Sequence, residues 1–134
     1  MSRPMSIFDI SGRAMAAQMV RLNTTASNMA NAGSIAGSEA SAYRSMKPVF
    51  RAINEAPGLS TVQVDGIVTS TATPTRRHDP SHPMADANGD IWEAAVDPTA
   101  EMVEMIEAAR QYQNNVQVLD TARTLILDTI RIGR

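Results

Sequence analysis

The chain has 134 residues, which is enough for one domain of ordinary size. Its 12 Lys and Arg nearly balance its 14 Asp and Glu, so the net charge of −2 argues against a polybasic nucleic-acid binder. The lack of Cys excludes disulfides, zinc fingers and thiol catalysis. No apolar run reaches the ~18 residues that a membrane-spanning helix needs, and the segment from Met1 to Ile10 lacks the apolar stretch of a cleavable signal.

A long helix is predicted near the N-terminus, within residues 1–32. Ser6 is placed to cap it, with Asp9 in the position of a capping box. The helix weakens at Asn31, before Gly33. Its apolar residues recur at a spacing of three or four, as in the seam of a coiled coil: Phe8, Met15, Met19, Leu22, Ala26 and Met29.

A second long helix is predicted within residues 97–134. Asp97 is a good N-cap, Pro98 suits the first helical position, and Gly133 stands where a glycine commonly ends a helix. Its apolar seam comprises Met102, Met105, Ala109, Tyr112, Val116, Leu119, Ile126 and Ile130.

The middle of the chain, residues 33–96, is predicted to be a flexible linker followed by a small module of strands and loops. Six of the seven prolines lie between Pro48 and Pro98, which excludes a long helix there. The β-branched segments 49–53 and 61–68 indicate strands. Asn88-Gly89 predicts a type I′ hairpin turn, and the composition predicts flexibility over 33–42 and an exposed loop over 72–83.

The two helices together predict an elongated subunit. A helix from Thr99 to Ile132 would be about 50 Å long, whereas a compact protein of this size is roughly 36 Å across. We therefore expect a mainly α fold with a small β-rich insert, in which the N- and C-terminal helices pack as a coiled-coil-like pair and form one discontinuous helical domain.

The polar face of the first helix favours burial in an assembly. From Ala14 to Ser38 the only charged residue is Arg21, and the remaining polar groups are neutral amides and hydroxyls. Such groups are buried against neighbours at lower cost than charges. The alternative interpretation is an ordinary Ala- and Ser-rich surface.

Candidate catalytic or metal-binding chemistry is sparse, and we expect no catalytic residue, no metal and no cofactor. His78, Asp79 and His82 offer part of a metal site, but without a further strong ligand a solvated loop is the default. The segment from Asp79 to Glu107 contains eight acidic residues and no Lys or Arg. It is expected to be a solvated face that repels wrong neighbours or meets a basic one.

Several strings resemble the bacterial family of flagellar rod, hook and related axial proteins. The N-terminal ones are residues 6–12, residues 18–23 and residues 26–32, in which Asn28, Ala30 and Asn31 form the most distinctive core. Residues 83–89, residues 101–116 and residues 118–133 continue the resemblance over nearly the whole chain. The short middle region favours a member of the proximal rod, because hook and distal-rod relatives have longer ones.

The resemblance implies a structural subunit of the hollow rod that crosses the periplasm, exported by the flagellar type III apparatus without signal cleavage. It implies other rod proteins, copies of the chain itself and proteins of the export-gate junction as partners. The alternative is a helical chaperone or adaptor of a type III secretion system, and a metal-dependent enzyme using His78 and His82 is the third hypothesis. The expected assembly residues are Met15, Leu22, Asn28, Ala30, Asn31, Met102, Tyr112, Val116, Leu119 and Ile126.

Overall fold

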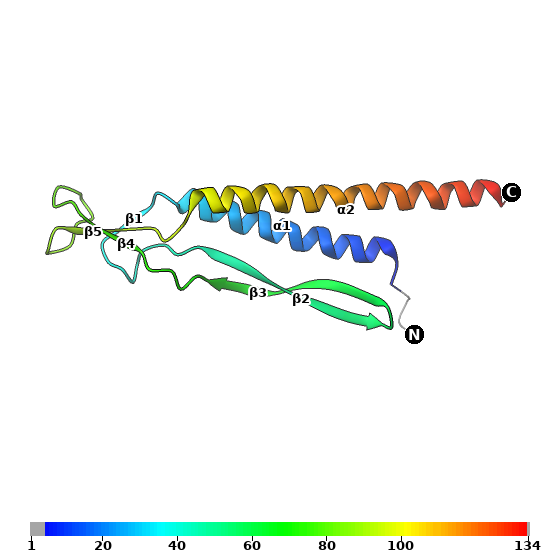
Figure 1. The fold of residues 1–134 in the computed structure, drawn as a ribbon, viewed down its shortest axis with the longest axis horizontal. Coiled ribbons are helices and arrows are strands. Elements are labelled where there is room, and N and C mark those ends of the chain that lie inside the picture. The colour runs from blue at the N-terminus through cyan, green and yellow to red at the C-terminus, as the bar shows by residue number, and fades with distance from the viewer. Residues whose placement is uncertain (1–4, 134) are drawn as a thin grey trace.

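The computed structural model describes residues 5–133 and shows an elongated molecule (Figure 1). One long helix comes first in the chain and the other comes last, and all five strands lie between them in the sequence. This confirms the expected mainly helical fold with a β insert. In chain order the elements are α1 (Ile7–Asn31), β1 (Ile35–Ala36), β2 (Met46–Ala56), β3 (Leu59–Thr69), β4 (Thr75–His78), β5 (Asp90–Glu93) and α2 (Pro98–Ile132).

Local capping signals explain where both helices begin. The Ser6 hydroxyl accepts the N–H of Asp9 at 3.3 Å, and the Asp9 carboxylate accepts the N–H of Ser6 at 2.8 Å, so the predicted capping box is present. Asp97 Oδ1 accepts the N–H of Thr99 at 3.0 Å, next to a proline in the first turn. Gly133 follows the last residue of α2 and has a φ of −82°. The end of this helix therefore does not use the left-handed backbone conformation that favours glycine.

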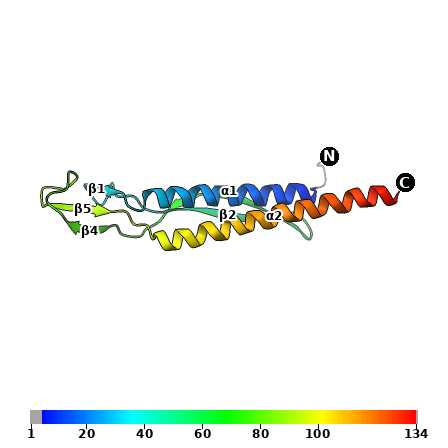
Figure 2. The same ribbon diagram turned by 90° about the horizontal axis from the view of Figure 1, so that it is seen from above.

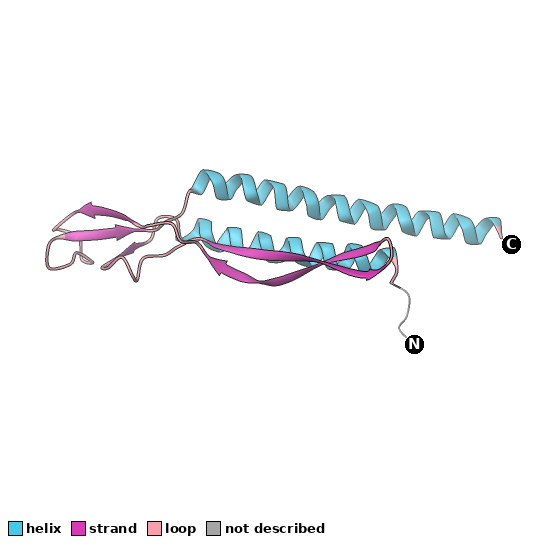
Figure 3. Cartoon of the chain, turned by 60° about the horizontal axis from the view of Figure 1, so that its bottom comes forward, coloured by secondary structure: helices cyan, strands magenta, loops and turns pink. Residues whose placement is uncertain are grey.

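The elements form three layers, in which α1 lies between α2 and a long hairpin made by β2 and β3 (Figures 1 and 3). The helices are antiparallel. Seen from above, α2 runs alongside α1 and extends past the residue at which α1 begins (Figure 2). The end of α1, the start of the hairpin and the start of α2 therefore meet in one place.

The hairpin pairs β2 with β3 in an antiparallel ladder from Met46↔Thr69 to Ala56↔Leu59. Both predicted strand segments are confirmed, and both strands are longer than predicted. The chain reverses at Pro57-Gly58, where Gly58 has a φ of 76° that suits glycine. A register shift between Val49 and Phe50 marks a β-bulge.

The far end of the molecule is a small sheet with the strand order β1-β5-β4, and its centre is the fully buried Ile91. Residues 33–42, for which flexibility is expected, contribute β1 and the buried Ala36 and Ala42. Part of the expected loop over 72–83 is strand β4, although its residues are exposed as expected.

The predicted type I′ turn at Asn88-Gly89 is wrong. That turn needs positive φ at both residues, and among the described residues only glycines have positive φ. Instead, Asp86 Oδ1 accepts the N–H groups of Asn88 at 2.8 Å and Asp90 at 2.9 Å within a longer loop over 79–89. The short polar side chain of Asp86 thus replaces the tight turn.

The apolar core within the chain is small. The buried apolar residues are Ala17, Ala36, Ala42, Ile91, Ala108 and Ala122. The accessible surface is 9070 Å², whereas a compact protein of this mass exposes about 6,800 Å². The chain therefore leaves about a third more surface uncovered than a compact monomer does.

Candidate assembly interface

Asn28 lies at the junction of the three layers and is 1% exposed. Its Nδ2 donates to the carbonyl oxygen of Met46 at 2.8 Å and to Glu101 Oε2 at 3.0 Å. Its Oδ1 accepts the Tyr43 hydroxyl at 2.9 Å and the N–H of Met46 at 2.8 Å. An asparagine amide has two donor hydrogens and two acceptor lone pairs, so every one of them is used.

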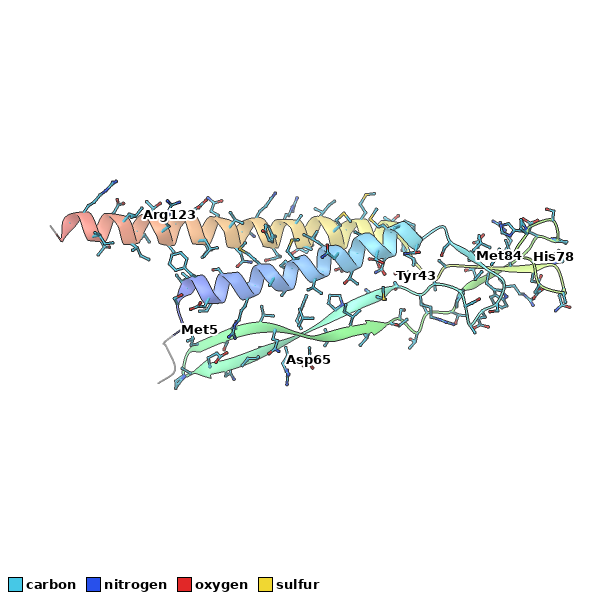
Figure 4. The ribbon with its side chains drawn as sticks, turned by 180° about the vertical axis from the view of Figure 1, so that it is seen from behind. Met5, Tyr43, Asp65, His78, Met84 and Arg123 are labelled. Atoms are coloured by element: carbon cyan, nitrogen blue, oxygen red, sulfur yellow. The ribbon has the colours of Figure 1, made fainter. Side chains whose placement is uncertain are left out.

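This junction links three segments that are far apart in the sequence. Asn28 is near the end of α1, Met46 begins β2, and Glu101 is in the first turn of α2. Tyr43 lies where the chain enters the hairpin (Figure 4). Because a buried amide without partners is costly, the network favours one relative placement of the hairpin and both helices.

A second polar contact holds the start of α2 against α1. Arg21 Nε donates to Glu104 Oε2 at 2.9 Å in a half-buried setting. Glu101 itself is only 5% exposed. The polar links described between α1 and α2 therefore lie in the first two turns of α2, and farther along α2 the less exposed residues are mainly small or apolar.

The predicted apolar seam of α1 is not the face that the chain buries. The buried residues of α1 are Ser11, Ala17, Thr24, Thr25 and Asn28. Met15 and Leu22 are half-buried, and Met19 and Phe8 are exposed. Small and hydroxyl side chains thus pack inside the subunit, and the larger methionines lie on a neighbouring stripe with no complete cover.

On α2, residues that are buried or half-buried recur at a spacing of three or four and face α1. They are Glu101, Met105, Ala108, Tyr112, Asn115, Leu119 and Ala122. Three of the predicted interface residues, Met102, Val116 and Ile126, are instead exposed. The predicted seam is therefore divided: Met105, Tyr112 and Leu119 are half-buried, and the other three are exposed.

The last part of α2 extends beyond its intrachain partner. Ile7, the first residue of α1, lines a shallow apolar pocket with Val118, Ala122 and Leu125. Residues 126–132 continue for about 10 Å past that point, and Figure 4 shows how far α2 runs beyond Arg123. The large apolar side chains exposed on this extension are Ile126, Leu127, Ile130 and Ile132, and Leu125 is exposed where it begins.

The remaining predicted residues lie at the end of α1. Asn31 Nδ2 donates to the carbonyl oxygen of Ser27 at 2.8 Å, so it serves a helix-end carbonyl. Ala30 is exposed. Of the two asparagines that stand out in the sequence, only Asn28 joins distant parts of the fold.

The acidic segment has specific contacts inside the chain and is not simply a solvated face. Asp90 pairs with His78 and Arg76, Glu93 with Arg77, and Asp97 caps α2. The serine at position 81 donates to Asp79, which is the main reason why the pKa of Asp79 is lowered. The N–H of Asp90 is the main group that lowers the pKa of Asp86.

The histidine loop does not form a metal site. His78 Nδ1 is 2.8 Å from Asp90 Oδ1, and His82 Nδ1 accepts the N–H of Met84 at 3.1 Å. Between residues 5 and 133 no group of three or more His, Cys, Asp or Glu is placed to hold a metal ion. His78 and Asp90 join neighbouring strands, which is a structural role.

Comparison with known proteins agrees with this arrangement of two terminal helices. A family described as flagella basal body rod protein matches residues 8–33, and one described as flagellar basal body rod FlgEFG protein C-terminal matches residues 87–132. The chain is 42% identical over 132 residues to flagellar basal-body rod protein FlgC of Salmonella typhimurium, covering 97% of this chain and 98% of the relative. The chain belongs to the FlgC family of flagellar basal-body rod proteins. FlgC of Yersinia enterocolitica is 43% identical with the same coverage.

The resemblance that the sequence indicates is thus confirmed, and this FlgC-family chain is a structural protein of the flagellar basal-body rod. The two matched regions contain α1 and α2 with Asn28 and Glu101, so both sides of the buried junction belong to the family's characteristic segments. Over the described residues, neither helix is long and apolar enough to cross a membrane.

Sequence reasoning missed several residues of the polar contacts that join α1, α2 and the hairpin. Tyr43 and Glu101 complete the network around Asn28, and Arg21 holds Glu104. One signal in the sequence points to the second of these contacts: Arg21 is an isolated charge in an otherwise neutral part of its helix, which indicates a specific acidic partner. Nothing local identifies Glu101, because it is one of several glutamates in the first turns of α2.

Proposed function

We propose that the protein is a subunit of the proximal rod, which polymerises by helix packing into a hollow tube that transmits torque and surrounds an export channel. The observation that carries the proposal is the mismatch between a core built mainly of alanines and helices that expose large apolar side chains. A monomer gains little from such a design, whereas an assembly buries those side chains between subunits.

The surface that the chain leaves uncovered is large enough for an interface between subunits. The excess over a compact monomer is about 2,200 Å², and a standard protein interface buries about 1,600 Å² in total. Coiled-coil-like packing is the geometry that we propose for the assembled helices, since Met15, Met19 and Leu22 recur on α1 at a spacing of three or four and none of them is buried.

The ten expected assembly residues then have two roles. Met15, Leu22, Met102, Val116 and Ile126 contact neighbouring subunits directly, and the exposed Ala30 permits close approach of a neighbouring helix. The others act inside the subunit. Asn28, Tyr112 and Leu119 set the angle at which α1, α2 and the hairpin are presented, and Asn31 completes the end of α1 through its hydrogen bond to Ser27.

The proposal extends to partners and location. Other rod proteins, copies of this chain and proteins of the export-gate junction are the partners, in the part of the basal body that spans the periplasm. The chain reaches this place through the flagellar export apparatus without a cleavable signal. We assign it no catalytic role, because the groups around the junction are all engaged in hydrogen bonds and ion pairs.

A deletion strain tests the proposal. Cells lacking the chain are expected to be non-motile and to yield basal bodies without a rod beyond the export gate, and re-expression of the chain restores both. An epitope placed in the exposed loop 79–89 is expected to be found in purified basal bodies. Complete rods without the chain, or its recovery only as a soluble complex with another exported protein, would contradict the rod assignment and favour the chaperone hypothesis.

A further inference from the structure

The hairpin made by β2 and β3 lies along α1, which separates most of it from α2 (Figures 1 and 3). Polar contacts tie the hairpin to α1 at two places. At its root, Asn28 bonds to both backbone groups of Met46. Near its tip, Arg13 Nη1 donates to Glu55 Oε1 at 2.7 Å, and we call this ion pair the latch. The root and the latch are about 22 Å apart along the axis of α1, so the part of the hairpin between them is held by its packing on the helix.

The root and the latch differ in strength. The amide of Asn28 at the root is buried, and all of its donors and acceptors are used. The latch lies at the surface, where the side chains of Arg13 and Glu55 are 46% and 34% exposed. An exposed ion pair contributes little to stability, and salt screens it. The hairpin is therefore firmly anchored at its root and weakly held at its tip.

Between the root and the latch the packing of the hairpin on α1 is incomplete. An open groove of about 440 Å³ follows the boundary of the two elements, and its apolar walls include Ala17 and Val20 of α1 and Val62 and Val64 of β3. Beside it, Thr61 is buried, and its Oγ1 has no hydrogen-bond partner. A buried hydroxyl without a partner costs free energy that water would return. The closed position of the hairpin thus gains little from apolar burial here and carries a penalty at Thr61.

The hairpin also has a place where it can bend, close to its root. Val49 pairs with Gly66, and the next residue of β2, Phe50, pairs with Val64. Asp65, labelled in Figure 4, is therefore the extra residue of the β-bulge. A bulge interrupts the ladder, and a glycine inside a strand brings no side chain to hold it straight. The strands can change direction here while the rest of the ladder stays paired.

We propose that the hairpin is a hinged arm, which stays anchored at Asn28, bends at the bulge and moves away from α1 when the latch between Arg13 and Glu55 opens. Opening lets water bond to the hydroxyl of Thr61, and it uncovers the face of α1 that contains Ala17. In the closed subunit the arm keeps that face from contact with any other protein. The opening is a property of the single chain, so it goes beyond the proposed rod function and does not depend on it.

A distance measurement between the arm and α1 tests the hinge, since the chain has no Cys of its own. Asn23→Cys on α1 and Ala56→Cys near the hairpin tip are both at exposed positions and accept spin labels in the purified full-length chain. We expect a main short distance from the closed arm and a several-fold larger long-distance fraction when Arg13→Ala removes the latch. Arg77→Ala is the matched control, because the pair of Arg77 with Glu93 at 2.6 Å is comparably exposed but lies in the small sheet. It should leave the distances unchanged.

Two further changes separate hinge opening from a general loss of stability. Thr61→Val replaces the unpaired hydroxyl with a methyl group of similar size, which removes the penalty of the closed state. The long-distance fraction should therefore fall below that of the unchanged chain. Arg13→Glu and Glu55→Arg should each raise the fraction, and the two changes together should lower it again, because the exchanged pair restores the latch.

Thiol labelling shows whether the arm uncovers α1. Ala17 is 3% exposed, so Ala17→Cys should react slowly with a maleimide in the unchanged background, several-fold faster with Arg13→Ala and more slowly with Thr61→Val. Asn23→Cys, which is exposed in every case, should react at one rate throughout. The hinge is overturned by the same distances with and without the latch, by an equal change in Arg77→Ala, or by labelling at position 17 that does not follow the distances. The rod function stands in each of these cases, because the deletion strain tests it separately.

Discussion

The side-chain amide of Asn28 donates to the carboxylate of Glu101 across 3.0 Å in the interior of the subunit. The two residues belong to different helices, and the same amide also holds both backbone groups of Met46. One buried side chain thus determines how α1, α2 and the hairpin are arranged. If the rod is built by packing helices, this junction sets the shape that each subunit offers to its neighbours.

Asn28→Ala is expected to destabilise the subunit strongly. The change removes a hydrogen-bond partner from the buried Glu101 and from the half-buried Tyr43 and Met46, and each fully buried group left unpaired costs about 1–3 kcal/mol. Asn31→Ala is the matched control from the same turn, and because Asn31 bonds only to a helix-end carbonyl, its loss should cost well under half as much. Urea unfolding of the purified variants measures both, and equal midpoints would contradict the junction.

Val116→Asp is expected to leave the monomer stable and to block assembly. Val116 is exposed in the chain, so an aspartate there stays hydrated in the monomer but is buried as a charge against a neighbouring helix. Gln113→Asp adds the same charge on the polar part of α2 and serves as the control. The readout is the amount of each variant in isolated basal bodies together with its melting temperature. Normal incorporation of the Val116→Asp chain would remove this residue from the interface.

Two glycines with the same backbone angle should respond differently to alanine. Gly58 and Gly89 both have a φ of 76°, so either change strains the backbone by roughly 1–2 kcal/mol. At Gly89 the new methyl group would also lie 2.9 Å from Cγ of Pro80 and 3.0 Å from Cε1 of His78, whereas the space at Gly58 is open. Thermal unfolding should therefore show a larger loss for Gly89→Ala, and the reverse order would contradict the loop packing.

Acid is expected to loosen the loop over 79–89. The pKa of Asp86 is lowered chiefly because its carboxylate accepts the N–H of Asp90. A carboxyl with a lowered pKa in the folded state stabilises that state at pH values above its ordinary pKa of about 3.9. This contribution disappears as the pH falls through the lowered value. Amide signals of Asn88 and Asp90 should shift in that range in an NMR titration, and Asp86→Asn should abolish the shift; an unchanged titration in the variant would contradict this assignment.

Local signals in the sequence predict the helices well. Ser6, Asp9, Asp97 and Pro98 act on backbone groups within one turn, so their effect depends on neighbouring residues alone. The turn at Asn88-Gly89 is mispredicted because Asp86 offers a competing acceptor two residues upstream. Whether two residues favour a tight turn thus depends on the side chains just outside it.

The candidate site is less predictable because its partners are distant. Asn28 stands out in the sequence, but Met46 and Glu101 lie 18 and 73 residues away. The seam on α1 shows a related limit. Periodicity identifies which residues share a face, but it does not say whether α2, the hairpin or another subunit covers that face. On α1 the small and hydroxyl side chains are buried within the subunit, and Met19 is exposed.

A density map of the intact basal body tests the central claim most directly. The account predicts that this chain is found in the rod with α1 and α2 packed along neighbouring helices, so that Met102, Val116 and Ile126 are buried between subunits while Asn28 stays bonded to Glu101. The account is contradicted if the same three side chains face solvent in the assembled rod, or if the chain occupies no position in it.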